Sequence, residues 1–191
     1  MKFNRTTISL VILALGLTGF VFFTEIKNQG FNLTPKAENQ EKKEKIFPFD
    51  TNEIKTISIQ VNGNKISFEK TKDSNQSWQM IQPQKITASN AAMSFLVNLF
   101  SQAENKVEIP LTEDKREEFG LNKSQHQIWL TLNNNEKYHI ILGKPNFDDS
   151  QIYAEVNFPK SVNSKQNIFL LSKSFQYAIE RDFDEWKEID N

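Results

Sequence analysis

The sequence predicts an α+β protein: an N-terminal transmembrane helix, then one domain of antiparallel β-meanders with two or three short helices. Three observations lead to this prediction. Residues 6–24 form an uncharged, mostly apolar stretch of 19 residues. Further along, short runs alternate apolar and polar residues and are separated by turn residues, as in half-buried strands. One apolar stripe with helical spacing interrupts these runs.

Residues 1–26 are expected to be a signal anchor that stays in the membrane. The uncharged stretch approaches the roughly 20 residues that span a hydrocarbon core of about 30 Å. A cleaved signal peptide has a shorter apolar stretch of about 7 to 15 residues that ends in small residues, whereas this one ends in FVFFTEI. Lys2 and Arg5 precede it, so the positive-inside rule places the N-terminus in the cytoplasm and the domain outside.

Residues 27–45 are expected to be a polar tether, because charged and polar residues dominate and apolar residues are too sparse for a core. Residues 46–191 then form the globular domain, which has the size of one ordinary domain.

The first half of the domain predicts a hairpin, a third strand and a helix. Apolar residues alternate on both sides of Asn62-Gly63, a pair typical of tight hairpin turns. The run SWQMIQP is a third strand that Pro83 ends. A helix follows with its apolar stripe from Ala92 to Ala103, and Thr87 or Ser89 is expected to cap it.

The second half repeats the order of strands followed by a helix. After a short strand and a helical turn that Gly120 ends, the runs IWLTL, YHIILG, IYAEV and NIFLL predict four strands. Gly143 is expected to end the second of these strands, with Lys144 solvated in the turn. An amphipathic piece from Phe175 to Arg181 closes the domain. This order suggests a duplicated unit of one meander plus one helix.

The anchor, SWQMIQP with a helix ending in NLF, EFGLN before a strand, ILGKP, IYAEV, NIFLLS and the final RDFDEWK together resemble domain-of-unknown-function family 4340. The chain is similar to the small single-anchor members that are common in cyanobacteria. The resemblance implies a periplasmic or thylakoid-lumenal domain and a role beside membrane machinery, as for larger relatives that accompany export and gliding systems. Its motifs are structural landmarks, and none is a catalytic signature. One departure is GLNK at Gly120 to Lys123, where many members have Asp and a nearby Pro after the GL pair.

Composition excludes several function classes. The chain has 23 Lys and Arg against 24 Asp and Glu, so it lacks the excess positive charge that nucleic-acid binding requires. It has no cysteine, which removes disulfides and thiolate metal sites. The phosphate-binding patterns GxGxxG and GxxxxGK and the hydrolase patterns GxSxG and HExxH are absent. No cofactor or metal is expected.

Three residues are candidates for an interaction surface: Trp129, Tyr153 and His139. Tyr153 is expected on the face of its strand opposite Ile152, Ala154 and Val156. A hydrolase or small-ligand site would instead use His126 or His139 with Asp148 or Asp149, because histidine titrates near neutral pH. A third alternative is a glycan contact through Trp129 and Tyr153. The acidic residues Glu180, Asp182, Asp184 and Glu185 lack the frame of a calcium loop and are expected to be solvated.

The sequence therefore predicts a membrane-anchored, non-catalytic binding or scaffolding domain. It would contact the bilayer through residues 6–24 and a membrane-protein partner through its domain. The alternatives are a binder of small ligands or envelope glycans and a hydrolase with a His/Asp site.

Overall fold

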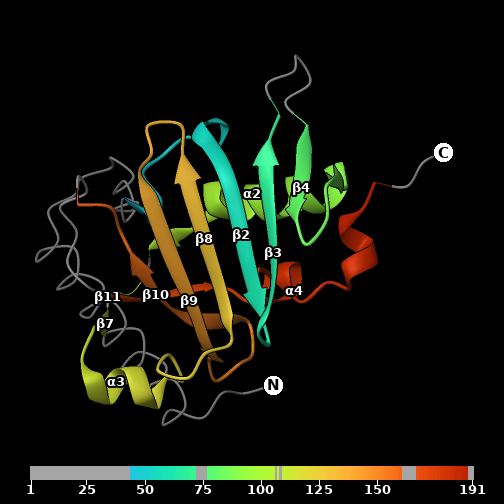
Figure 1. Ribbon diagram of the computed structural model, residues 1–191. Helices are drawn as coiled ribbons and strands as arrows, with labels where there is room; N and C mark the ends of the chain where they lie inside the picture. Colours follow the sequence, from blue (N-terminus) through green and yellow to red (C-terminus); the bar gives the residue numbers. More distant parts are fainter. Residues whose placement is uncertain (1–43, 72–76, 106, 108, 161–166, 189–191) are drawn as a thin grey trace, which may run out of the picture. The chain divides into compact units, whose positions relative to one another are not determined.

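The computed structural model describes residues 44–71, 77–105, 107, 109–160 and 167–188 (Figure 1). The chain divides into two compact units, Met1–Lys42 and Lys43–Asn191, and every described residue belongs to the second. The predicted anchor over residues 6–24 and nearly all of the predicted tether lie outside the described residues. Within the described ranges, no helix is long and apolar enough to cross a membrane.

The described domain is built on an antiparallel sheet of nine strands in the order β5-β4-β3-β2-β8-β9-β10-β11-β7 (Figure 1). Two four-stranded meanders, β2 to β5 and β8 to β11, meet where β2 pairs with β8. The predicted antiparallel meanders are therefore confirmed. The strands are β2 (Ile54–Val61), β3 (Asn64–Lys70), β4 (Trp78–Gln82), β5 (Ile86–Thr87), β7 (Ile109–Pro110), β8 (His126–Leu132), β9 (Lys137–Pro145), β10 (Gln151–Asn157) and β11 (Asn167–Ser172).

Helices follow each meander, as predicted. They are α2 (Asn90–Gln102), α3 (Glu113–Glu118) and α4 (Ser174–Ile179), with two 3-10 turns, η1 (Thr51–Glu53) and η2 (Phe183–Trp186). Of the two expected caps, Ser89 is the one used: its side chain accepts a hydrogen bond from the backbone N–H of Ala92, which would otherwise lack an intrahelical partner. The sequence did not predict the short pair β1 (Glu44–Lys45) and β6 (Glu104–Asn105), which joins the start of the domain to the end of α2.

The two faces of the sheet differ in what covers them. One face carries the alternating apolar residues of the strands, such as Ile57 and Ile128, and packs against α2, α4 and Trp186 in a single large core. The opposite face carries a smaller apolar cluster of Phe119, Leu121 and Ile168 beside α3. Figure 1 shows α2 on one side of the central strands and α3 near the β11 end of the sheet. We call the part of the opposite face that lies on β3, β2, β8 and β9 the open face.

Turn residues with positive φ fix the register of the hairpins β2–β3 and β8–β9. Asn62 and Gly63 adopt positive φ values of 51° and 83°, as the tight turn between β2 and β3 requires. Asn135 does the same at 66° in the turn between β8 and β9. Because each turn fixes which residues lie opposite one another, it also fixes which side chains share a face.

The prediction for Gly143 was wrong. Strand β9 continues through Gly143 to Pro145, and the backbone N–H of Lys144 donates to the carbonyl of Phe119 at 2.7 Å. A Cβ atom at Gly143 would lie 2.2 Å from that carbonyl oxygen, so glycine is needed for close approach of the loop after α3. Lys144 is likewise part of the strand, and its ammonium donates to the carbonyl of Glu118 at 3.0 Å.

Candidate functional site

The centre of the open face is a stacked pair of rings from two neighbouring strands. Trp129 on β8 lies directly opposite His139 on β9. Their ring centroids are 4.8 Å apart and their planes are inclined by 6°. Both side chains are partly exposed, and Figure 1 shows no helix of the described residues in front of β8 and β9, on the side away from α2. Two of the three residues predicted for an interaction surface therefore form one aromatic site.

A cation lies on the other side of this pair. The ammonium of Lys65 on β3 is 5.2 Å from the centroid of the Trp129 ring. Strand β2 separates β3 from β8, and at the level of Trp129 it presents only the small side chain of Ser58, which shares a hydrogen bond of 2.8 Å with Ser67. The indole therefore lies between an imidazole and an ammonium group, an arrangement favourable to cation–π attraction.

A hydrogen bond orients the imidazole of His139. The side-chain amide nitrogen of Gln127 donates to the carbonyl of Ser124 at 3.3 Å, so its oxygen faces His139 Nε2 at 2.8 Å. With this assignment Nε2 is the donor and Nδ1 of the neutral ring is an acceptor. Burial lowers the pKa of His139 below its ordinary value of 6.5, although the charge of Glu155 acts in the opposite direction. The ring is therefore neutral at pH 7.

Tyr153, the third predicted residue, is on the same face of the sheet but belongs to the other end of it. It points away from Ile152, Ala154 and Val156, as predicted, because those three are in the large core and Tyr153 packs against the cluster beside α3. Its ring stacks on Phe119 with centroids 3.8 Å apart. Tyr153 therefore supports the α3 region and does not join the ring pair of Trp129 and His139.

A buried ion pair connects α3 to this face. The guanidinium of Arg116 donates to both oxygens of Glu155, with Nε to Oε2 at 2.9 Å and Nη2 to Oε1 and Oε2 at 2.9 and 2.7 Å. The Glu155 side chain is only 4% exposed and that of Arg116 is 30% exposed. The hydrogen bonds to Glu155 raise the pKa of Arg116. The pair therefore joins α3 to β10, and both carboxylate oxygens of Glu155 accept hydrogen bonds from Arg116.

The two histidines lie on opposite faces of the sheet. Successive side chains of a strand alternate between faces, and His126 shares its face with Ile128 and Leu130 of the large core, whereas His139 is opposite Trp129. Their positions in one hairpin therefore do not bring the two imidazoles into one site. Among the described residues, no group of three His, Asp or Glu side chains is placed to hold a metal ion.

His126 makes a contact that the sequence did not predict. Its Nε2 lies 2.9 Å from Oε1 of Glu180, at the end of α4. Ser124 is close by, but its hydroxyl contacts the backbone carbonyl and N–H of His126 and the carbonyl of Leu142, with no contact to the imidazole. Nucleophilic catalysis requires a hydroxyl within hydrogen-bond reach of the base, and this hydroxyl is engaged elsewhere.

Neither aspartate proposed for a hydrolase site contacts a histidine. Asp148 accepts hydrogen bonds from the backbone and side chain of Ser150, and these bonds lower its pKa. Asp149 forms an ion pair with Lys173. The four acidic residues near the C-terminus are exposed, as expected: Glu180, Asp182, Asp184 and Glu185.

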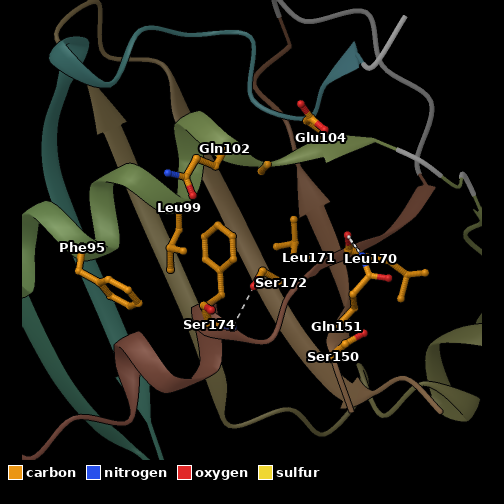
Figure 2. A pocket seen from close by; sticks show the side chains of 12 residues that line it. Phe95, Leu99, Gln102, Glu104, Ser150, Gln151, Leu170, Leu171, Ser172 and Ser174 are labelled. Atoms are coloured by element: carbon orange, nitrogen blue, oxygen red, sulfur yellow. Dashed lines mark hydrogen bonds between the residues drawn. The ribbon is translucent and has the colours of Figure 1, made fainter. Parts of the chain in front are cut away.

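A cavity of about 530 Å³ lies on the helix-covered side, between the second half of α2, the end of β11 and the start of α4. Figure 2 shows Leu99 on α2 and Leu171 on β11 pointing into it, with Gln151 and Ser150 at its other end. Among the described residues that line it, Glu104 is the one charged side chain, and the others are apolar or carry neutral polar groups. It is on the face of the sheet opposite Trp129 and His139.

The sequence missed Lys65 and Gln127 as parts of the open face, and it missed the Arg116–Glu155 pair between α3 and β10. A signal existed for Gln127, which is two residues before Trp129 and so shares its face. Lys65 comes from another hairpin, and its position depends on how β2 pairs with β8.

The comparisons with known proteins add no relative. No family model, no curated protein and no solved structure matches the chain. The resemblance to family 4340 therefore stays a prediction.

Proposed function

We propose that this chain is a non-catalytic binding domain, anchored in a membrane by its N-terminal segment, and that its open face binds a membrane-protein partner. The observation that carries the proposal is the ring pair of Trp129 and His139, partly exposed and flanked by Lys65. Tryptophan is among the residues most enriched at binding hot spots, because it offers a large area at a low cost in conformational entropy.

The contacts of the other titratable groups support binding over catalysis. His139 donates to an amide, His126 pairs with Glu180 while the nearby hydroxyl of Ser124 is bonded to the backbone, and Glu155 is engaged by Arg116. General base catalysis needs a base within reach of the proton that it removes. The described geometry instead offers a preformed surface on which His139, Gln127 and Ser58 already have hydrogen-bond partners.

We further propose that the domain is a duplicated unit of one meander and one helix. Two features support this proposal. The first meander precedes α2 and the second precedes α4. The first hairpin of each meander also has an asparagine with positive φ in its turn, Asn62 in the first meander and Asn135 in the second.

The test is native gel migration of the tagged full-length chain, extracted from its own membranes in mild detergent, with mass spectrometry of what comigrates. The proposal expects a discrete larger complex. Trp129→Ala should weaken this complex by roughly tenfold or more, as loss of a hot spot does. His126→Ala should leave it intact, because that imidazole is on the other face.

A lone monomer in every preparation contradicts the proposal. It would favour the second candidate function, binding of a small ligand, for which the cavity beside Leu99 and Gln151 is the supporting observation. A glycan contact through Trp129 would then involve this ring alone, since Tyr153 is stacked under Phe119.

A further inference from the structure

Phe147, at the tip of the turn between β9 and β10, has no packing partner. Its relative exposure is 106%, whereas the other exposed large apolar residues of the described domain lie between 40% and 57%. Removing a large aromatic ring from water is strongly favourable. A ring that the fold leaves wholly exposed therefore retains that free energy for a contact with another molecule.

The turn that carries Phe147 is tightly built. The backbone N–H of Asn146 donates to Gln151 O at 2.8 Å, and the Asn146 side chain accepts from Gln151 N at 3.0 Å. The Asp148 side chain accepts from Ser150 N at 3.0 Å. Asp149 adopts a φ of 61° and its carboxylate pairs with Lys173. Four residues of the turn thus fix the backbone on both sides of Phe147.

The same turn is tied to α4, which adds a second exposed aromatic residue. The backbone N–H of Lys173 donates to Ser150 O at 3.1 Å. The Lys173 ammonium, which pairs with Asp149, also lies 5.5 Å from the centroid of the Tyr177 ring. Tyr177 is 57% exposed. We call the surface formed by Phe147, Asp148, Lys173 and Tyr177 the Phe147 surface.

We propose that the Phe147 surface is a preformed docking element for a protein partner, and that the ring of Phe147 enters an apolar pocket whose rim carries Lys or Arg side chains. The hydrogen bonds of the turn hold the backbone on both sides of Phe147, so binding through its ring does not also have to order the turn. This inference goes beyond the open face, since none of its four residues belongs to β3, β2, β8 or β9.

The charge beside Phe147 favours a basic protein rim over an anionic lipid surface, because Asp149 offsets the ammonium of Lys173. Hydrogen bonds from Ser150 lower the pKa of Asp148, which therefore remains ionised next to Phe147 at neutral pH. Asp148 is not paired with a cation in the described contacts. An anionic bilayer surface would repel this carboxylate, whereas Lys or Arg at a pocket rim would attract it.

The first experiment is site-specific photo-crosslinking in the full-length chain in its own membranes. Phe147 is replaced by p-benzoylphenylalanine, and the matched control carries the same group at Ile81, which is 44% exposed on β4. The proposal expects a discrete light-dependent adduct from position 147 only, joined to a partner peptide that contains apolar residues next to Lys or Arg. No adduct, an adduct to lipid or to a second copy of this chain, or equal adducts from both positions would overturn it.

The second experiment compares variants on the native gel. Phe147→Ala should weaken the complex at least about tenfold, and Asp148→Asn by a smaller factor. The melting temperature of Phe147→Ala should stay at the wild-type value, because its ring is wholly exposed. A complex that survives Phe147→Ala unchanged overturns the inference.

The two proposals can fail separately. Loss of the complex with Trp129→Ala but not with Phe147→Ala supports the open face and removes the Phe147 surface. The reverse result keeps the Phe147 surface and removes the open face. If Trp129→Ala and Phe147→Ala each abolish the complex, both proposals are supported.

Discussion

Tyr138 and His139 are consecutive residues of β9, yet they belong to two different environments. Tyr138 points into the helix-covered face, where its ring lies 4.9 Å from Phe49 and 6.0 Å from Phe158, and burial raises its pKa to about 12. His139 points to the open face, where it stacks on Trp129 and bonds Gln127. The comparison shows that one face holds the large core, whereas the other presents a partly exposed pair of rings.

The largest expected effect is on the helix-covered face, at Trp186. This residue is 0% exposed, and its ring centroid is 5.0 Å from that of Phe68. Trp186→Ala should lower the free energy of unfolding by about 3–5 kcal/mol, because a large buried ring is replaced by a cavity. Chemical denaturation followed by circular dichroism measures this difference.

The matched control is Trp129, the tryptophan on the open face. Trp129→Ala should cost less, roughly 1–3 kcal/mol, since the ring loses its stacking partner and its buried area but is partly exposed, unlike Trp186. Trp186→Phe is a second control: the indole N–H of Trp186 makes no hydrogen bond in the described part of the chain, so phenylalanine should lose packing alone. Equal destabilisation by Trp129→Ala and Trp186→Ala would show that the open face is also core.

The next effect concerns the ion pair between Arg116 on α3 and Glu155 on β10, beside the open face. Arg116→Met would leave the Glu155 carboxylate, which is 4% exposed, without its cation. Removal of one partner of a buried ion pair costs about 3–5 kcal/mol, and we expect the lower end because Arg116 itself is 30% exposed. Thermal or chemical unfolding at pH 7 measures the loss.

The double variant separates the charge from the packing. Arg116→Met combined with Glu155→Gln should recover most of the lost stability, since no unpaired charge remains in the interior. If the double variant is as unstable as Arg116→Met alone, the ion pair is not what holds α3 to the sheet.

Local sequence signals predicted most of the fold, and one part of the site. The turn at Asn133 to Asn135 brings Leu132 and Glu136 together, as the hydrogen bond between Leu132 N and Glu136 O shows. Counting outward from this turn places Trp129 opposite His139. The ring pair was therefore within reach of the sequence, because the length of a hairpin turn fixes its register.

Other parts depend on contacts between distant segments, which no local pattern records. Lys65 reaches Trp129 only because β2 pairs with β8, and Arg116 reaches Glu155 only because α3 packs on β10. Gly143 was misinterpreted for the same reason. A side chain at this position would clash with the carbonyl of Phe119, which lies 24 positions earlier in the chain. The burial of Trp186 also depends on a distant segment, because its ring packs against Phe68 of β3.

The smallest expected effect is a pH dependence of the free energy of unfolding that arises from His139. Its pKa in the folded chain is below the value of about 6.5 that applies in the unfolded chain. Between those two values the unfolded chain binds more protons, so the free energy of unfolding should fall as the pH is lowered through about 6.5 and level off below the folded pKa. One proton limits the slope to roughly 1.4 kcal/mol per pH unit. The stability of His139→Gln, measured from pH 8 to pH 5, should lack this contribution. An identical pH dependence in the wild type and the variant would mean that protonation of His139 costs the open face nothing, and that its ring is as solvated in the folded chain as in the unfolded one.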